Sequence, residues 1–161
     1  MNDALVIRPA VEADVESMAD WTARVPLFAE HGITAAGVER QLRAALEDPG
    51  ASLLAATLEG VPVGFAHFLL KGGFGRSGYL KLLSVDGAVR SQGVGRALMA
   101  ELELRFLSPN GLFLLCTHTN TAARRFYEAL GYQQIGAVPD YLTPGLQEVI
   151  YFKAAPSGAG P

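Results

Sequence analysis

Residues 89–99 read VRSQGVGRALM and join an expected strand to an expected helix. Gly93 and Gly95 precede an apolar helical pattern, with Arg90 and Arg96 close by. The N-terminus of a helix carries N–H groups that lack intrahelical partners and about half a positive charge. Glycines let an oxyanion approach these groups without meeting a Cβ atom. The stretch therefore predicts an anion site, and phosphate is the anion that it favours.

Three phosphate-binding motifs compete for this loop. A P-loop requires GxxxxGK followed by Ser or Thr, and no such sequence follows these glycines. A dinucleotide fingerprint requires a small third residue where Leu98 stands, and its loop opens the domain. The third motif, RxxGxG, is present as Arg90-Ser-Gln-Gly93-Val-Gly95. The structural alternative is a glycine pair that only shortens a connection.

Hydrophobic periodicity supplies the surrounding elements. Apolar residues recur every four positions over residues 93–106, which predicts an amphipathic helix. The uninterrupted apolar run 112–116 predicts a central strand. Asn120 is positioned to cap the next helix, and Gly131 to end it.

The rest of the chain alternates between strand and helix patterns. Further strands are predicted at 4–10, 52–58, 63–70, 79–85, 133–138 and 149–153, and further helices at 13–24 and 34–47. Buried helix positions are predicted at Ala13, Met18, Trp21, Ala122, Phe126 and Leu130. These elements predict an α/β fold with a mixed sheet and about four helices.

Composition limits the classes of function. The chain has 161 residues, half of them apolar, and a net charge of −3. Its length predicts one domain over residues 1–153, and its composition a flexible tail at 154–161. Its basic residues form no patch for a nucleic acid, so a phosphate site must be built locally.

Cysteine and histidine usage predicts a cytoplasmic protein without a metal site. No apolar run approaches the roughly 20 residues of a membrane span, and no signal peptide is visible. The single cysteine, Cys116, lies in an apolar run and is expected to be a buried thiol in a reducing compartment. The three histidines are far apart in sequence, and no metal-ligand spacing stands out.

Two motifs together resemble a known family. RxxGxG follows the strand that ends at Val85, and residues 120–132 read NTAARRFYEALGY, with Pro139-Asp140-Tyr141 further along. This order resembles the GNAT superfamily of acetyl-CoA-dependent N-acetyltransferases from about residue 5 to 153. The resemblance implies a mostly antiparallel central sheet of about seven strands flanked by about four helices. It also implies acetyl transfer to an amine within a ternary complex, and it is compatible with a homodimer.

The resemblance assigns a coenzyme to the glycine loop and to its neighbours. Backbone N–H groups of Gln92, Gly93, Val94, Gly95 and Arg96 are implied to hold the pyrophosphate. Arg90 and Arg96 add charge there, or else are solvated arginines at a helix start. Pantetheine is implied to bind the backbone of Leu83, Ser84 and Val85, where two strands splay apart. Further coenzyme contacts are implied for Asn120, which also caps a helix, and for Phe126 and Tyr127, with Phe126 expected mainly in the core.

Tyr127 is the catalytic residue that the resemblance indicates most strongly. A phenol of pKa about 10 is well suited to protonate a thiolate leaving group. The alternative is a core aromatic with a buried hydroxyl. Many family members carry a glutamate on the strand before the glycine loop, but residues 79–85 contain no carboxylate. The base is therefore open between His118, a water relay through Ser84, a residue on the acceptor side, and no base at all.

Acceptor contacts are the least specified. The candidates are Phe28, Glu30, His31, His67, Asp140 and Tyr141. Asp140 would favour a cationic amine, or else it only shapes a turn. Peptide N-termini, lysines, polyamines, aminoglycosides and small amino acids all fit. Two other functions stay open: a noncatalytic acyl-CoA sensor or scaffold, and a nucleotide binder.

Overall fold

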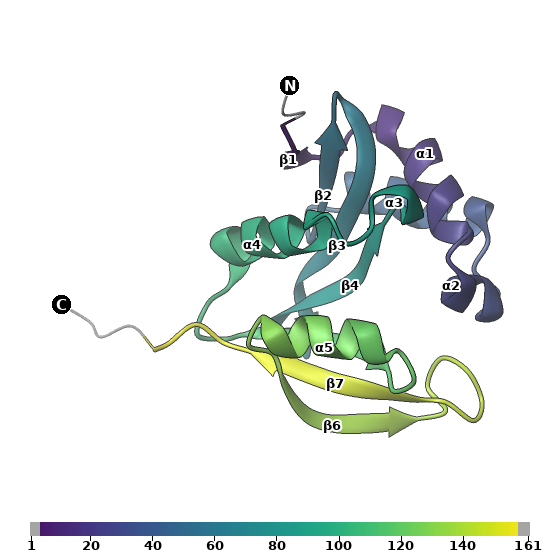
Figure 1. Cartoon of the computed structure of the whole chain (residues 1–161). Coiled ribbons are helices and arrows are strands. Elements are labelled where there is room, and N and C mark those ends of the chain that lie inside the picture. The colour runs from purple at the N-terminus through teal and green to yellow at the C-terminus, as the bar shows by residue number, and fades with distance from the viewer. Residues whose placement is uncertain (1–3, 158–161) are drawn as a thin grey trace. The chain divides into compact units, whose positions relative to one another are not determined.

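Seven strands form a mixed sheet in the computed structural model, which describes residues 4–157. The strands lie in the order β1-β2-β3-β4-β5-β7-β6 (Figure 1). β4 and β5 pair in parallel, whereas the pairs β1–β2, β2–β3, β5–β7 and β6–β7 are antiparallel. The strands are β1 (Val6–Pro9), β2 (Ala51–Leu58), β3 (Val61–Gly73), β4 (Ser77–Val85), β5 (Leu112–Thr117), β6 (Gln133–Pro139) and β7 (Gln147–Lys153). The predicted α/β class and mixed sheet are confirmed.

Five α-helices and one 3₁₀ helix, η1 (Gly87–Val89), accompany the sheet within the described residues. The α-helices are α1 (Glu12–Ala23), α2 (Pro26–Glu30), α3 (Ala35–Glu47), α4 (Val94–Phe106) and α5 (Thr121–Ala129). Contacts group the residues into two compact units. The first unit contains residues 4–70 and 82–106, and the second contains residues 71–81 and 107–157.

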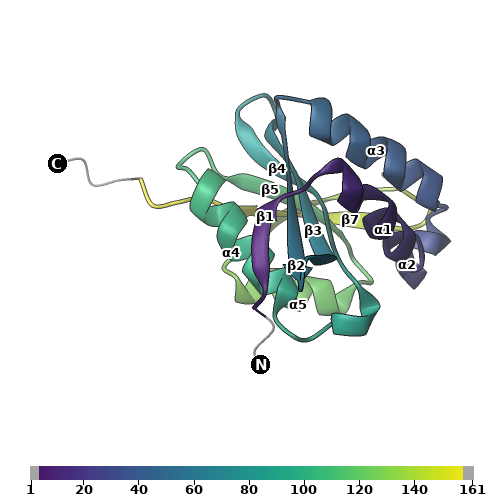
Figure 2. The same ribbon diagram turned by 90° about the horizontal axis from the view of Figure 1, so that it is seen from above.

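The first unit packs helices on both faces of its strands (Figure 2). On one face, α1 and α3 cover a core that includes Met18, Leu42, Leu53 and Phe65. On the other face, α4 lies directly against β3. A Cβ atom at Gly64 would come within 2.8 Å of Val94 Cγ1, so only glycine allows this close approach.

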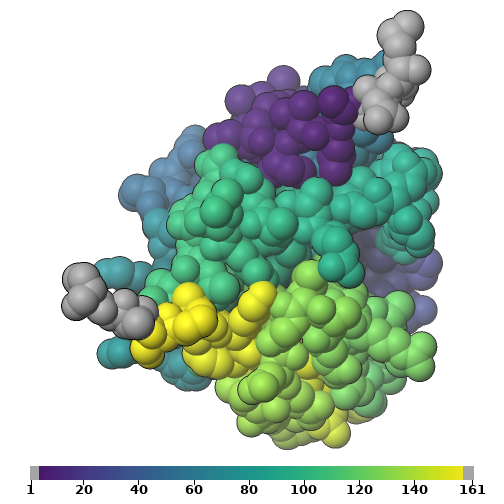
Figure 3. All heavy atoms as spheres, turned by 60° about the vertical axis from the view of Figure 1, so that its left-hand side comes forward, coloured from purple at the N-terminus to yellow at the C-terminus, as the bar shows by residue number. Residues whose placement is uncertain are grey.

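The second unit lays α5 along its strands (Figures 1 and 3). The face that α5 covers includes Tyr151, whose hydroxyl donates to Glu128 Oε1 at 2.7 Å and accepts from Arg124 Nε at 3.1 Å. The cross-strand partner of Tyr151 is Leu114, so β5 and β7 present alternate residues to this helix. Figure 3 shows β7 (yellow) beside α5 and β6 (light green).

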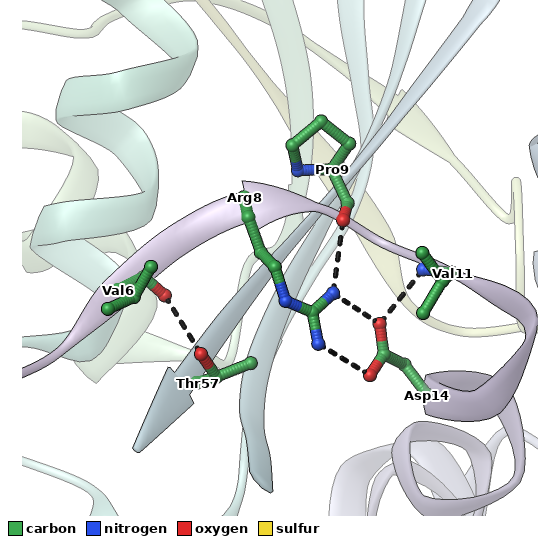
Figure 4. A network of polar contacts seen from close by, with 6 residues as sticks. All are labelled: Val6, Arg8, Pro9, Val11, Asp14 and Thr57. Atoms are coloured by element: carbon green, nitrogen blue, oxygen red, sulfur yellow. Dashed lines mark hydrogen bonds and ion pairs between the residues drawn. The ribbon is translucent and has the colours of Figure 1, made fainter. Parts of the chain in front are cut away.

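An ion pair joins β1 to the start of α1 (Figure 4). Arg8 donates to both carboxylate oxygens of Asp14, at 2.7 and 2.9 Å. Asp14 Oδ2 also accepts from the backbone N–H of Val11 at 2.9 Å. The bond from Arg8, with help from that N–H, lowers the pKa of the Asp14 carboxyl although burial opposes the shift.

Asp14→Asn is expected to lower the free energy of unfolding by about 2 kcal/mol at pH 7, because it removes charge-assisted hydrogen bonds. Since folding lowers the pKa of Asp14, this stabilisation is present above the unfolded pKa of about 3.9 and is lost as the pH falls through the lower folded value. Urea unfolding at pH 7 and pH 3 measures both effects. Asp20→Asn is the control, because the Asp20–Arg24 pair is exposed and is expected to contribute under about 1 kcal/mol. An equal loss at both pH values would contradict the role of the charge.

Several local predictions need correction. Residues 26–30, between the predicted helices 13–24 and 34–47, form the unpredicted helix α2, because Pro26 occupies a first-turn position and suits a helix start. Ala13 is exposed, and Asp14 and Val15 occupy the buried positions beside it. On α5, Ala122 is exposed and Phe126 is only half-buried, because Tyr127 is the residue that enters the core.

The predicted C-terminal tail is only partly covered by the described residues. Of the predicted tail 154–161, residues 158–161 lie outside the described part, and Ala155 N–H donates to Ser108 O at 3.1 Å. Within residues 4–157, no helix is both long and apolar enough to cross a membrane. The single domain over 1–153 stays a prediction.

Candidate active site

The glycine loop connects β4 to α4 inside the first unit. Asp86 Oδ1 accepts from Ala88 N–H at 3.1 Å and starts η1. Ser91 and Gly93 have φ values of +65° and +83°, which turn the chain into the helix. A φ of this sign is comfortable for glycine and strained for other residues.

The N-terminus of α4 is arranged to bind an anion. Ala97 N–H donates to Gly93 O at 3.0 Å, so the N–H groups of Val94, Gly95 and Arg96 precede the first intrahelical bond. A Cβ atom at Gly93 would meet no atom within 4 Å. Open space therefore lies beside unpaired helical donors, and the loop fits an oxyanion.

Side chains of the loop divide into a buried anchor and exposed polar groups. Val94 is 3% exposed and packs toward Gly64, so only its backbone faces the loop. Arg90, Gln92 and Arg96 are at least partly exposed. Their exposure agrees with a role in binding and equally with solvation, so their assignment stays a prediction.

Ser84 on β4 already has a polar partner. Thr22 Oγ1 donates to Ser84 Oγ at 3.1 Å, and both side chains are buried. The neighbours Leu83 and Val85 are half-buried. The Ser84 hydroxyl is thus held by α1, and a relay role for it remains a prediction.

Pairing between β4 and β5 is short. Its register runs from Gly78–Leu112 to Leu80–Leu114, while β4 continues to Val85 and β5 to Thr117. The splayed strands implied by the family resemblance would begin where this parallel register ends.

Tyr127 is fixed in the second unit by the way α5 ends. Gly131 has φ +90°, and the N–H groups of Gly131 and Tyr132 donate to the carbonyls of Glu128 and Tyr127 at 3.0 and 3.1 Å. This is a Schellman motif, in which the residue after the glycine packs on the last helical turn. The rings of Tyr127 and Tyr132 accordingly meet edge to face, with centroids 5.9 Å apart.

Burial controls the protonation of Tyr127. The side chain is 9% exposed and also contacts Phe126 and Tyr151. Burial, with a smaller contribution from Cys116, raises the pKa of the Tyr127 phenol above its usual value. The hydroxyl is therefore protonated at neutral pH and available as a hydrogen-bond and proton donor.

Asn120 is confirmed as a helix cap. Its Oδ1 accepts from Ala123 N–H at 3.2 Å, which satisfies one of the free donors of α5. Its side chain is half-buried. Contact with a coenzyme stays a prediction.

Cys116 is a buried thiol, as expected. It is 5% exposed, and burial is the main cause that raises its pKa to about 11. Glu148 raises the pKa further and Arg124 lowers it. A thiol with this pKa is protonated at pH 7 and is a poor nucleophile.

Comparison with known proteins assigns the family. Residues 15–132 match the family model of the GNAT acetyltransferases. The chain belongs to the GNAT family. It is 31% identical over 88 residues to an uncharacterised N-acetyltransferase of Methanocaldococcus jannaschii, an alignment covering 53% of this chain and 56% of that protein. The chain thus spans about half the length of this curated relative.

Solved GNAT structures share the fold. A protein of Desulfovibrio desulfuricans assigned to the GNAT family superposes with a TM-score of 0.79 at 20% identity, covering 94% of this chain and 99% of that one. A Salmonella typhimurium protein assigned as an acetyltransferase and solved with its cofactor acetyl-CoA gives a TM-score of 0.72 at 20% identity, covering 98% of both chains.

His118 lies against the backbone of Gln147. Its Nδ1 is 3.2 Å from both the N–H and the carbonyl oxygen of Gln147, so the ring accepts from the first or donates to the second according to its tautomer. In the donating tautomer Nε2 is the acceptor nitrogen, and the role of base for His118 stays a prediction. The backbone N–H of His118 also donates to Gln147 O at 3.0 Å.

The predicted acceptor residues are distributed over both units. In the first unit, Phe28 and His31 are half-buried, Glu30 is exposed and His67 is buried in β3. In the second unit, Asp140 and Tyr141 are exposed. Asp140 Oδ1 accepts from Gly145 N–H at 2.7 Å, so this carboxylate shapes the turn between β6 and β7.

Sequence reasoning missed one charged group in the second unit. Glu148 on β7 is 2% exposed, and both of its oxygens lie near Thr117 Oγ1, at 3.0 and 3.3 Å. Its position just before the predicted strand gave no signal of burial. Among residues 4–157, no group of three or more His, Cys, Asp or Glu side chains is placed to hold a metal ion.

Proposed function

We propose that this GNAT protein transfers an acetyl group from acetyl-CoA to a primary amine by direct transfer in a ternary complex. The glycine loop is the observation that carries the proposal. Gly93 has a φ of +83° and open space beside it at the N-terminus of α4, and Arg90 and Arg96 are exposed nearby in the sequence. Three free N–H groups and a positive helix end match a pyrophosphate. The acetyl-CoA held by the Salmonella typhimurium protein supports this choice of phosphate carrier.

Tyr127 supplies the proton in the proposed reaction. The amine nitrogen attacks the acetyl carbonyl, a C–N bond forms, and the C–S bond breaks. The departing thiolate takes the Tyr127 proton, the nitrogen releases its proton to water, and water returns a proton to the Tyr127 phenolate. Burial keeps the phenol protonated at neutral pH and also makes it a weaker acid, because a phenolate in apolar surroundings is disfavoured. In this proposal the proton therefore passes to the sulfur only as the C–S bond breaks.

Cys116 is not an acyl carrier in this proposal. With a pKa of about 11, its thiol holds its proton at pH 7. We expect Cys116→Ala to leave kcat unchanged, and the wild-type chain to carry no acetyl group on Cys116 after incubation with acetyl-CoA. Peptide mass spectrometry and steady-state rates measure these outcomes. An acetylated Cys116, or a folded but inactive Cys116→Ala variant, would point to a covalent intermediate instead.

Turnover tests the proposal against a noncatalytic acyl-CoA sensor. The purified chain is incubated with acetyl-CoA and, in turn, a peptide with a free N-terminus, a lysine peptide, spermidine, kanamycin or alanine. Thiol release is followed with a chromogenic disulfide, and the product is identified by mass. We expect amine-dependent release with at least one acceptor. Binding of acetyl-CoA without release across the panel would favour the sensor.

The setting of the reaction is also proposed. A single buried thiol suits a reducing compartment, so we assign the protein to the cytoplasm. We further propose that it uses no metal and takes its amine from small molecules or peptides. A homodimer is compatible with this function.

A further inference from the structure

Glu148 is a buried carboxylate without a cationic partner among residues 4–157. It is 2% exposed, and its hydrogen bonds come from one hydroxyl, Thr117 Oγ1. Burying an ionised carboxylate costs several kcal/mol unless charge or hydrogen bonds compensate. One neutral donor compensates only part of this cost. A carboxylate in this position would therefore be stabilised by a cation from outside the chain.

The sheet register places Glu148 on the face opposite α5. Thr117 and Glu148 are cross-strand partners at the end of β5. Their neighbours Cys116 and Val149 alternate to the other face, where Tyr151 contacts α5. By the same alternation and the β4–β5 register, Tyr79 lies on the face of Glu148, through its partner Phe113.

Tyr79 is a tyrosine within electrostatic range of this carboxylate. Burial is the main cause that raises the pKa of Tyr79, and Tyr141 and Glu148 add to the shift, so both groups lie within electrostatic range of Tyr79. Tyr141 is 60% exposed, in the turn between β6 and β7. Glu148 directly follows the exposed residue Gln147 at the start of β7. Hydroxyls and one anion together suit an ammonium group.

We propose that Glu148 is the acceptor-side carboxylate: it binds the amine substrate as an ammonium ion and removes one proton from it. This inference rests on the proposed acetyl transfer and specifies its substrate class as a cationic primary amine. The proton moves from nitrogen to a Glu148 oxygen, and the neutral amine then attacks the acetyl carbonyl. The glutamic acid later returns its proton to water.

Asp140 and His118 are competing candidates for this role, and both have backbone partners. Asp140 accepts from Gly145 N–H, and Nδ1 of His118 lies 3.2 Å from both the N–H and the carbonyl oxygen of Gln147. Glu148 differs from both in its burial. A structural role for Glu148 is the main alternative. The two roles predict different results for the isosteric variant Glu148→Gln, which keeps the volume and a hydrogen bond to Thr117 but removes the charge.

The experiment compares Glu148→Gln with the wild type over a range of pH. The acceptor is the lysine peptide or spermidine, whichever gives the faster turnover. We expect kcat/KM for the amine to fall about 100-fold at pH 7. The loss should shrink to less than about tenfold at pH 9.5, because an amine of pKa near 10 then supplies its own neutral form. Glu148→Asp keeps the charge and should retain more activity than Glu148→Gln.

Binding and stability provide readouts besides activity. The affinity for acetyl-CoA should be unchanged in Glu148→Gln, and its melting temperature should not be lower than that of the wild type, since a buried charge is removed. Glu128→Gln is the matched control, since Glu128 is an exposed glutamate that accepts from Tyr151 on the other face; its pH profile should match the wild type.

Three results would overturn the inference, and they are distinguishable. Wild-type kcat/KM in Glu148→Gln at pH 7 would remove Glu148 from the reaction. An equal loss at every pH together with a lower melting temperature would make the residue structural. Failure of the wild-type chain itself to release thiol with any amine would instead remove the proposed function, and with it this substrate class.

Discussion

Gly93→Val is expected to weaken acetyl-CoA binding about 1,000-fold. The substitution places a β-branched residue at φ +83°, which such residues adopt only with strain, so the loop must rearrange. Its side chain would also project into the open space beside the free N–H groups of α4. Two charge-assisted hydrogen bonds of about 2 kcal/mol each account for a loss of this size. Isothermal titration with acetyl-CoA measures the affinity.

Gly60→Val separates backbone strain from the loss of a binding site. Gly60 has φ +81°, and a Cβ atom there would meet no atom within 4 Å, as at Gly93, but Gly60 lies in the β2–β3 turn. We expect both variants to lose similar stability, and only Gly93→Val to lose affinity. Equal affinities for acetyl-CoA in the two variants would refute the loop as the pyrophosphate site.

Tyr127→Phe is expected to lower kcat about 1,000-fold with little change in the dissociation constant of acetyl-CoA. The variant removes the proton donor and keeps the ring, which fills the core beside Tyr132. Single-turnover rates and coenzyme titration measure the two quantities separately. An unchanged kcat would make Tyr127 a core aromatic only.

Tyr151→Phe is the control for losing a tyrosine hydroxyl in the same unit. The Tyr151 hydroxyl donates to Glu128 and accepts from Arg124, so its removal is expected to cost about 1–2 kcal/mol of stability. The variant should keep the wild-type kcat. A large fall in kcat for both variants would indicate that packing, not proton donation, explains the effect of Tyr127→Phe.

Local patterns predicted much of the fold. The four-residue apolar period and Gly93 placed α4 within one residue of its observed start at Val94, because both signals are local. Gly131 ended the helix after Asn120 as expected, since a positive φ is a property of that one position. Helix α2 was missed because its five residues are too few to show a period.

Long-range pairing explains what the sequence could not reveal. Glu148 lies beside the predicted strand 149–153 and resembles a surface residue until Thr117, 31 positions earlier, becomes its cross-strand partner. The Thr22–Ser84 contact, 62 positions apart, is equally invisible in either segment. Phe126 is predicted in the core, but Tyr127 is the buried residue of α5, and its ring packs against Tyr132 and Tyr151.

The measurement that tests the central claim most directly is a thermal-shift titration of the purified chain with acetyl-CoA, CoA, ATP and NAD. A ligand at 100 times its dissociation constant stabilises the folded state by about 2.7 kcal/mol, which is readily detected. We predict stabilisation by acetyl-CoA and CoA and none by ATP or NAD at the same concentrations. Stabilisation by ATP or NAD alone, or by none of the four, would contradict a coenzyme A pyrophosphate site at Gly93.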